Sequence, residues 1–289
     1  MTNSINTSTQ LCAVIGNPVA HSLSPAMHNA AFAAAGLNYV YLAFAVGDLA
    51  GCMAGMRAMD GFRGLSVTIP HKVAVMEHLD AIDALAKRVG CVNTVVNEKG
   101  RLLGTITDGL GTLRAFEQAS VSLENKRVLF VGTGGAARAV AFAMLDACRP
   151  QTVRILGRTP ARMQRLVADL GAFSEIPITG GSLARDLAQA VAESDVIIQA
   201  TPLGMHGHAE GECPVPRELL RPEHIIFDMV YRPMKTQLIR YAEEVGCVSI
   251  LGLEMLLNQA VLQFDLWTGA PAPVQVMRQT LIEALQENP

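Results

Sequence analysis

The stretch that decides the fold is RVLFVGTGGAARAVAFAML, residues 127–145. An apolar run of strand length leads into a glycine turn, and an apolar stretch of helical length follows it. Gly132, Gly134 and Ala137 fit G-x-G-x-x-G/A, whose glycines allow a tight turn and close backbone approach to a pyrophosphate at a helix N-terminus. An ordinary glycine turn in a doubly wound sheet is the alternative. Because strand, glycines and helix occur together, the sequence predicts a dinucleotide-binding turn. Its residues are Gly132, Thr133, Gly134, Gly135 and Ala136.

The end of the next expected strand indicates which dinucleotide is bound. NAD-binding proteins place an acidic residue there, whereas arginine accommodates the 2′-phosphate of NADP. Here Arg158 and Arg162 bracket Thr159, and a guanidinium matches a phosphate in charge and geometry. Two solvated arginines are the alternative, but with Pro160 in the first helical turn they would oppose the helix dipole unless an anion were present. The sequence therefore predicts NADP as the cofactor.

Apolar runs of strand length alternate with helical stretches along almost the whole chain, which is typical of βαβ units on a parallel sheet. We expect an α/β protein with two domains, one of them a Rossmann-type doubly wound domain. The expected strands are 11–16, 39–46, 65–69, 128–131 and 247–251, with a hairpin over 91–107, and the expected helices are 24–35, 48–59, 71–88, 108–120 and 251–269. Ser24 as N-cap, Pro25 at the first helical position and Gly36 after the end mark the first helix.

Two changes in pattern suggest the domain boundaries. A helix opens near residue 108, just before the glycine-rich unit, and a long helical pattern resumes near 252 after the last expected strand. We expect one α/β domain made of 1–107 plus 253–289 and a dinucleotide-binding domain made of 108–252. The C-terminal helices would then pack back on the first domain.

Composition excludes several classes of protein. Half of the 289 residues are hydrophobic and 17% are charged, which disfavours disorder. The net charge is −3, the pI is near 6.2, and no basic stripe occurs, so we expect no nucleic-acid partner.

The first 47 residues carry no charged side chain, but polar residues interrupt them and no basic segment precedes an apolar one. We therefore expect neither a membrane span nor a signal peptide, and a cytoplasmic location. The six cysteines lie far apart without a C-x-x-C pair, so we expect reduced thiols.

Eight short motifs occur in order along the chain. They are Ser22-x-Ser24, SVTIPHK (66–72), Asn93-Thr94, Thr107-Asp108, GTGGAAR (132–138), QATPLGM (199–205), DMVYRPMKT (228–236) and GLEMLLNQA (252–260). Each alone is a weak signal, but together they resemble the shikimate dehydrogenase family over about residues 11 to 270. The resemblance implies a hydroxylated cyclohexene carboxylate held between an α/β domain and a Rossmann domain. It also implies an NADP-dependent, reversible reduction of 3-dehydroshikimate to shikimate, a step in aromatic amino acid biosynthesis.

Two residues match the catalytic pair of that family. Hydride delivery to a carbonyl leaves negative charge on the oxygen, which an acid or a cation must stabilise and protonate. By the resemblance, Lys72 is that group, in the pattern T-x-P-x-K, and Asp108 is its partner, which orients the ammonium and binds an adjacent substrate hydroxyl. The alternatives are a surface lysine at the start of a helix and an aspartate N-cap, and for Asp108 both interpretations are compatible.

The same resemblance assigns the ligand-binding residues. Those implied for the substrate carboxylate are Ser22, Ser24 and Tyr231, those for ring hydroxyls or carboxylate are Thr68, Asn93 and Gln259, and those lining the nicotinamide are Thr201, Met229 and Gly252. Ser24 could instead be a helix cap, Gln259 a satisfied buried amide and Tyr231 a core ring. The pair His206 and His208 lacks a third ligand, so we expect no metal site.

Two positions depart from the family pattern. The family usually has asparagine where this chain has Ser66 and Ile106. A site that hydrogen-bonds a substrate hydroxyl can discriminate between substrates by up to ~10⁴-fold, so loss of such a group can change which substrate is preferred. Ser66 can still donate one hydrogen bond, whereas Ile106 cannot. In a strand, however, Thr105 and Thr107 face one side and Ile106 the other, so Ile106 could serve packing only. We interpret the chain as a divergent member of the family.

Three other functions stay open. The first is a related dehydrogenase acting on quinate or an amino-substituted shikimate, which the two departures favour. The second is a non-catalytic metabolite-binding protein, which the presence of Lys72 and Asp108 disfavours. The third is a folate-pathway dehydrogenase with a similar two-domain plan, which lacks the Ser-x-Ser and Gly-Leu-Glu-Met-Leu motifs. Both a monomer and a homodimer are compatible with the sequence.

Overall fold

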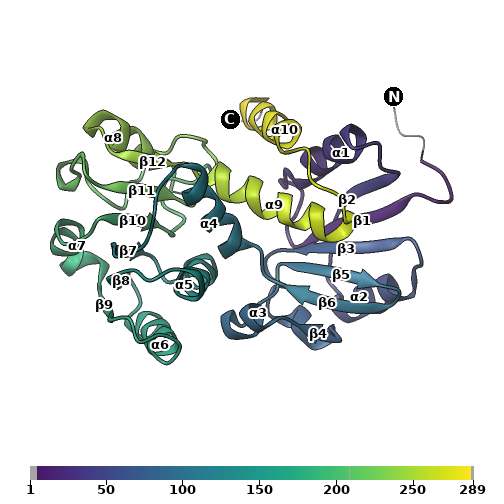
Figure 1. Ribbon diagram of the computed structural model, residues 1–289, viewed down its shortest axis with the longest axis horizontal. Helices are drawn as coiled ribbons and strands as arrows, with labels where there is room; N and C mark the ends of the chain where they lie inside the picture. The colour runs from purple at the N-terminus through teal and green to yellow at the C-terminus, as the bar shows by residue number, and fades with distance from the viewer. Residues whose placement is uncertain (1–4, 208, 288–289) are drawn as a thin grey trace. The chain divides into compact units, whose positions relative to one another are not determined.

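The computed structural model describes residues 5–207 and 209–287, which form two compact units. Unit 1 takes in the chain up to Thr107 and again from Gln259, and unit 2 runs from Asp108 to Asn258. The division falls inside one continuous helix, α9 (Gly252–Thr268), so this helix belongs to both units (Figure 1).

Unit 1 is built on a mixed sheet in the order β2-β1-β3-β5-β6-β4. Its strands are β1 (Gln10–Gly16), β2 (Tyr39–Ala45), β3 (Phe62–Val67), β4 (Ala81–Ile82), β5 (Thr94–Glu98) and β6 (Arg101–Thr105). Its helices are α1 (Ser24–Ala34), α2 (Leu49–Ala58), the 3-10 helix η1 (Ala74–His78), α3 (Ala84–Val89) and α10 (Val274–Glu287). β1 pairs parallel with β2 and β3, and β5 forms an antiparallel hairpin with β6.

Unit 2 is a parallel sheet in the order β12-β11-β10-β7-β8-β9, which is the doubly wound order expected for a Rossmann-type domain. Its strands are β7 (Arg127–Val131), β8 (Thr152–Gly157), β9 (Ile178–Ser182), β10 (Val196–Gln199), β11 (Ile225–Asp228) and β12 (Val248–Ile250). Its helices are α4 (Asp108–Gln118), α5 (Gly135–Ala147), α6 (Pro160–Gly171), α7 (Leu183–Ala192), the 3-10 helix η2 (Arg217–Leu219) and α8 (Gln237–Val245). The α/β fold class is confirmed.

The core of unit 1 closes around Trp267 near the end of α9. Its indole donates to the Val95 carbonyl oxygen at 3.0 Å, and a Cβ on Gly64 would collide with the ring. Glycine at position 64 therefore lets the helix lie directly on the sheet. Because Trp267 is fully buried, the C-terminal segment is an integral part of this core.

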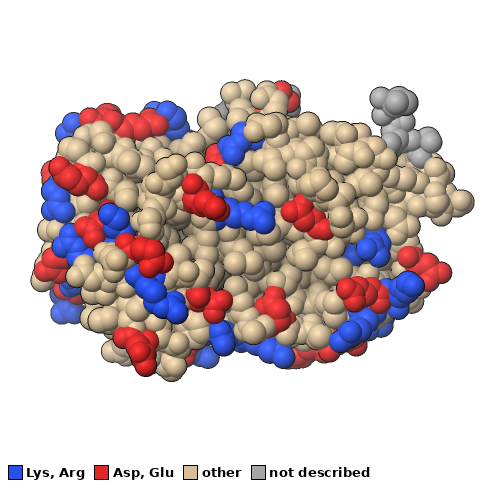
Figure 2. Space-filling model, viewed as in Figure 1, with Lys and Arg blue, Asp and Glu red and all other residues tan. Residues whose placement is uncertain are grey.

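Charged side chains of both signs are interspersed on the face shown in Figure 2, without a continuous basic stripe. The uncharged first 47 residues include β1, α1 and β2. The upper right of that view, where Figure 1 places these elements, is almost entirely free of charged side chains. This segment thus adds no charge either to the buried strand β1 or to the exposed end of β2.

The predicted N-cap of the first helix is wrong by one position. α1 begins at Ser24 itself, and Leu23 occupies the N-cap position without a side-chain hydrogen bond. The Ser22 hydroxyl instead accepts a hydrogen bond from the Ser24 N–H at 3.3 Å. Pro25 accordingly occupies the second helical position instead of the first, whereas Gly36 follows the helix at φ +65°, as predicted.

The predicted helices over 71–88 are also largely wrong. The chain forms a turn, then η1, then the two-residue strand β4, and only α3 is a true α-helix. The Asp80 N–H donates to the Leu102 carbonyl oxygen at 2.9 Å, and β4 pairs parallel with β6. Pairing with the sheet edge has overridden the helical pattern.

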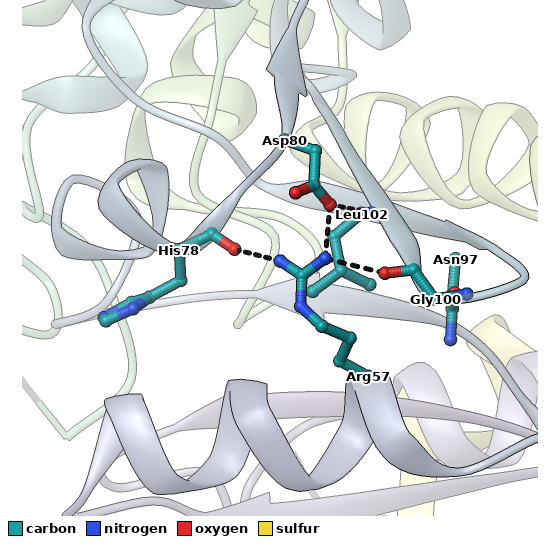
Figure 3. Close-up of polar contacts among 6 residues, drawn as sticks. All are labelled: Arg57, His78, Asp80, Asn97, Gly100 and Leu102. Atoms are coloured by element: carbon teal, nitrogen blue, oxygen red, sulfur yellow. Dashed lines mark hydrogen bonds and ion pairs between the residues drawn. The ribbon is translucent and has the colours of Figure 1, made fainter.

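The side chain of Arg57 on α2 explains why the chain reaches this edge (Figure 3). The guanidinium pairs with the Asp80 carboxylate and donates to the carbonyl oxygens of Gly100 at 2.6 Å and of His78 at 2.9 Å. Asp80 in turn accepts the Leu102 N–H at 2.7 Å. One side chain thus joins α2, η1 and the β5–β6 hairpin, which no local sequence pattern reveals.

Candidate functional site

The predicted dinucleotide-binding turn lies at the carboxyl ends of β7 and β10, where the strand order of unit 2 reverses. Gly132 follows β7 with φ +122°, and a Cβ there would lie 2.7 Å from the Ala200 carbonyl oxygen, so only glycine fits. Gly134 is the N-cap of α5 without a side-chain hydrogen bond. Gly134, Gly135 and Ala136 are exposed. An anion can therefore approach the N–H groups at this helix N-terminus.

Neighbouring side chains fix the shape of the turn. A Cβ on Gly157, at the end of β8, would lie 2.8 Å from Thr133 Cγ2. Thr133 can therefore pack against position 157 only because that residue is glycine. Thr201 Cγ2 would lie 3.1 Å from a Cβ on Gly132. The buried Gln199 holds Thr201, since its Oε1 accepts the Thr201 N–H at 2.8 Å and its Nε2 donates to the Thr201 carbonyl at 3.0 Å. The sequence pattern assigns no role to either Gly157 or Gln199, although Gln199 opens the motif QATPLGM.

The predicted phosphate-binding arginines lie where β8 passes into α6. Arg158, Thr159 and Arg162 are all exposed. α6 begins at Pro160, as expected, with Thr159 at the N-cap position and no acidic residue in the first turn. Two guanidinium groups and a helix N-terminus without a carboxylate fit the 2′-phosphate of NADP better than a ribose hydroxyl.

A buried carboxylate organises the loop that follows β11. Asp228 Oδ2 accepts the Thr236 hydroxyl at 2.6 Å, and its Oδ1 accepts the Val230 N–H at 3.0 Å. Burial raises the pKa of Asp228 to about 6, although both hydrogen bonds act in the opposite direction. The side chain thereby joins the two ends of the loop that carries Met229 and Tyr231, both partly buried. The sequence pattern did not indicate a role for Asp228.

Met229 and Gly252 lie together beside this loop. The Met229 N–H donates to the Gln199 carbonyl at 3.0 Å, which places it next to the end of β10. A Cβ on Gly252 would lie 2.6 Å from the Val230 carbonyl oxygen and 2.7 Å from that of Met229. Glycine there lets α9 start directly against the loop. The predicted nicotinamide-lining residues thus gather at the carboxyl edge of the unit 2 sheet.

The predicted residues divide between the two units. Unit 1 contains Ser22, Ser24, Thr68, Lys72, Asn93 and Gln259, and unit 2 contains Asp108, Tyr231 and every predicted cofactor residue. Ser24 and Gln259 are buried, whereas Ser22 and Tyr231 are partly exposed.

Lys72 lies in a turn after β3 that is held on two sides. The His71 ring nitrogen Nε2 lies 2.9 Å from the Val46 carbonyl oxygen, and the Lys72 carbonyl accepts the Val92 N–H at 2.8 Å. Thr68, at the start of the turn, donates its N–H to Ile15 at the end of β1. Lys72 is partly exposed and precedes η1 rather than opening a helix. Its backbone is fixed while its side chain keeps access to the surface.

Asn93 binds the residue that precedes Asp108. Its Oδ1 accepts the Thr107 N–H at 2.8 Å, and its Nδ2 donates to Thr107 Oγ1 at 3.0 Å. Asp108 is the first residue of α4 and is buried, and its carbonyl accepts the Thr112 hydroxyl at 3.2 Å. The carboxamide of Asn93 thereby fixes the backbone from which the Asp108 side chain starts.

The two departures from the family pattern face inward. Ser66 is 8% exposed; it accepts the Tyr41 hydroxyl at 2.6 Å and donates to Gln263 Oε1 at 2.8 Å. Its single proton therefore goes to Gln263, and not to a ligand as the sequence suggested. Ile106 is 1% exposed, which supports its interpretation as a packing residue.

Other expectations concern metals, thiols and membranes. Among residues 5–207 and 209–287, no group of three or more His, Cys, Asp or Glu side chains could hold a metal ion. His206 pairs with Glu210 at 3.2 Å, and His208 lies outside the described residues. Each of the six cysteines is a free thiol. In the described part of the chain, no helix is both long and apolar enough to cross a membrane.

Three family models match successive parts of the chain. The shikimate dehydrogenase substrate binding domain matches residues 14–95, the shikimate / quinate 5-dehydrogenase model matches residues 114–206, and the shikimate 5′-dehydrogenase C-terminal domain matches residues 252–282. The matches therefore cover both units and the helix α9 that they share.

Full-length relatives and solved structures agree with these models. The NADP(+) shikimate dehydrogenase of Moorella thermoacetica is 46% identical over 284 residues, 97% of this chain and 95% of the relative. The crystal structure of Listeria monocytogenes shikimate 5-dehydrogenase with shikimate and NAD is 38% identical, with a TM-score of 0.91, over 97% of this chain and 99% of that one. The Thermus thermophilus enzyme with NADP(H) and shikimate is 36% identical, with a TM-score of 0.85, over 96% and 100%.

Arg158→Ala tests the phosphate-binding prediction. We expect the Kd for NADP to rise about 10- to 100-fold and the Kd for NAD to change little, because a charge-assisted hydrogen bond contributes ~1.5–3 kcal/mol. Fluorescence titration with both dinucleotides measures the effect. Arg165→Ala, an exposed arginine further along α6, is the control. Equal losses for NAD and NADP would contradict a role in 2′-phosphate binding.

Asp228→Asn tests the buried carboxylate. Its pKa in the folded protein lies above the ordinary value of about 4, so its stabilising effect is present below about pH 4 and is lost as the pH rises to about 6. We expect the melting temperature of the wild type to fall relative to that of the variant over this interval and then to run parallel. Calorimetry of both proteins across this range measures it. A difference that does not change with pH would show that Asp228 titrates normally.

Proposed function

The chain belongs to the shikimate dehydrogenase family, and we propose that it catalyses the NADP-dependent, reversible reduction of 3-dehydroshikimate to shikimate. The observation that carries this proposal is the turn that contains Lys72 in unit 1, which hydrogen bonds hold in a fixed conformation. Its backbone is fixed at Val92 and through His71, and its side chain is accessible. A positioned ammonium is what a carbonyl reduction requires of the protein.

Unit 2 supplies the residues that would hold NADP. We propose that residues 132–136 hold the pyrophosphate, that Arg158, Thr159 and Arg162 bind the 2′-phosphate, and that Thr201, Met229 and Gly252 line the nicotinamide. The fit is supported by Gly132, where a side chain would collide with the Ala200 carbonyl group and so prevent this turn. When bound, the reduced cofactor supplies the hydride.

Unit 1 supplies most of the residues that would hold the substrate. We propose that Ser22 and Ser24 bind the carboxylate together with Tyr231 of unit 2. Thr68, Asn93 and Gln259 would bind the ring hydroxyls or the carboxylate. These side chains are hydroxyls and carboxamides, and each can donate to a carboxylate or exchange hydrogen bonds with an alcohol.

Lys72 and Asp108 would carry the proton chemistry. In the direction of reduction, the Lys72 ammonium stabilises the negative charge that develops on the carbonyl oxygen and donates the proton to it. In the direction of oxidation, the neutral amine accepts that proton. Asp108 would accept a hydrogen bond from a neighbouring substrate hydroxyl and so orient the ring.

The structure favours shikimate over the related substrates considered from the sequence. The case for quinate or an amino-substituted shikimate rested on Ser66 and Ile106. Ser66 gives its proton to Gln263, and Ile106 is buried. Neither side chain thus forms a new wall for a different substrate. The presence of both Lys72 and Asp108 likewise supports catalysis over passive binding of a metabolite.

We propose a cytoplasmic enzyme that acts on a small carboxylate, without a nucleic-acid or membrane partner. A monomer and a homodimer are both compatible with the fold.

Substrate preference is the direct test of this function. We expect the purified protein to oxidise shikimate with NADP at a higher kcat/KM than it shows in the other three pairings, which are shikimate with NAD, quinate with NADP and quinate with NAD. We expect this because Ser66 gives its proton to Gln263 and Ile106 is buried, so neither side chain offers a new contact to a different substrate. NADPH absorbance measures all four combinations in parallel. A clear preference for quinate would reject the proposed substrate, and saturable shikimate binding without turnover would reject the proposed catalysis.

Lys72→Ala tests the proton donor. We expect kcat to fall by about 10²–10⁴-fold, the usual contribution of general acid–base catalysis, while the Kd for shikimate changes little. Stopped assays of turnover and calorimetric titration with shikimate separate the two effects. Lys87→Ala removes an exposed lysine on α3 of the same unit and serves as the control. Turnover close to that of the wild type would exclude Lys72 as the acid.

A further inference from the structure

A chain of buried side-chain hydrogen bonds runs through unit 1 from Tyr41 to Asn93. Tyr41 on β2 donates to Ser66 Oγ at 2.6 Å, and Ser66 on β3 donates to Gln263 Oε1 at 2.8 Å. Gln263 on α9 donates through Nε2 to Thr94 Oγ1 at 2.9 Å, and Thr94 donates to Asn93 Oδ1 at 2.8 Å. All five side chains are buried. The chain thus connects four elements of the unit below its surface.

The direction of these hydrogen bonds is fixed by one carbonyl group. Gln263 Nε2 lies 3.4 Å from the backbone carbonyl oxygen of Asn93, which can only accept. The amide must therefore turn its NH₂ group toward Asn93 and its oxygen toward Ser66. Ser66 must then give its single proton to Gln263, so Tyr41 has to be the donor to Ser66. Burial raises the pKa of the Tyr41 phenol, which therefore keeps the proton that this arrangement requires.

The chain ends at groups proposed to act on the substrate. The carboxamide of Asn93 is a proposed substrate-binding group. It also accepts the Thr107 N–H and donates to the Thr107 hydroxyl. Thr107 directly precedes Asp108 in the sequence. A loss of order in the Asn93 side chain would therefore reach two proposed site residues at once.

The ring of Tyr41 is held independently of its hydroxyl. It stacks on His28 with ring centroids 4.5 Å apart and lies 5.8 Å from Trp267. Burial lowers the pKa of His28 to about 3, so the imidazole beside the phenol is neutral. Replacing Tyr41 with phenylalanine therefore removes the hydrogen bonds of the hydroxyl, to Ser66 and to Ser24, and leaves the ring packing in place. Because Ser24 is a proposed substrate-binding residue, the comparison with Ser66→Ala below is needed to identify the route through Ser66.

We propose that Tyr41 is a positioning residue for the reaction, acting through Ser66 and Gln263 to fix Asn93 and Thr107. This inference rests on the proposed function, because it takes Asn93 as a substrate-binding residue. It assigns a role to Tyr41 and to Gln263, which no sequence motif singled out. It also gives Ser66, the departure from the family pattern, a purpose inside the protein.

Tyr41→Phe is the test, with Tyr39→Phe as its matched control. Tyr39 lies two residues earlier on the same strand. Its hydroxyl donates to the Trp267 carbonyl oxygen at 3.5 Å and takes no part in the series of hydrogen bonds from Tyr41 to Asn93. We expect Tyr41→Phe to lower kcat/KM for 3-dehydroshikimate about tenfold, the value of one hydrogen bond, with KM for NADPH unchanged. Tyr39→Phe should leave both constants unchanged. Equal effects of the two substitutions would overturn the proposal.

Ser66→Ala and the double variant with Tyr41→Phe identify the route. Two residues that act through one chain are not additive, so the double variant should be no slower than the slower single variant. Independent, multiplying losses would show that Tyr41 does not act through Ser66. The melting temperature of each variant is measured beside its kcat/KM, because a positioning effect lowers kcat/KM at temperatures at which every variant is still folded.

A readout without substrate distinguishes failure of this inference from failure of the proposed function. Hydrogen exchange of the Asn93 side-chain amide, followed by nuclear magnetic resonance, should be faster in Tyr41→Phe and unchanged in Tyr39→Phe. Faster exchange in a protein that does not reduce 3-dehydroshikimate would overturn the function and retain the positioning chain. If Tyr41→Phe shows normal turnover and unchanged exchange of the Asn93 amide, the positioning role of Tyr41 is overturned and the proposed function is retained.

Discussion

Parallel pairing of strands places their carboxyl ends at one edge of a sheet, and both units of this protein depend on that constraint. In unit 1, the loops after β1 and β3 carry the serine pair and Lys72. In unit 2, the loops after β7, β8, β10 and β11 carry the glycine turn, the arginines, Thr201 and Met229. Within each unit, residues far apart in sequence therefore reach one edge of its sheet.

Buried polar side chains then give these loops a defined shape. Asn93, Gln199 and Asp228 each bind backbone groups of the loop in which they lie or of one beside it. All three are buried, so leaving a partner unsatisfied would be costly. Precise loop geometry in this protein thus comes from polar groups inside the fold, whereas apolar contacts set the positions of the strands and helices.

The sequence predicts what depends on local pattern and fails where distant contacts decide. The strand, turn and helix around Gly132 and the start of α6 at Pro160 follow from their own residues. The prediction of helices over 71–88 is wrong because this segment binds Arg57 and pairs with the edge strand β6 instead. The bond between Ser66 and Gln263 joins residues 197 positions apart, so no motif could reveal that the Ser66 proton is already used.

The division of the chain between the units has a consequence for biosynthesis. Unit 2 is one continuous segment, whereas unit 1 needs Gln263 and Trp267 from the C-terminal part of the chain to close its core. During translation, the second unit can fold while its neighbour still waits for residues that the ribosome has not yet made. Until then, the strands β1 to β3 lack the helix that covers them, and apolar strands left exposed in this way are prone to aggregate during synthesis.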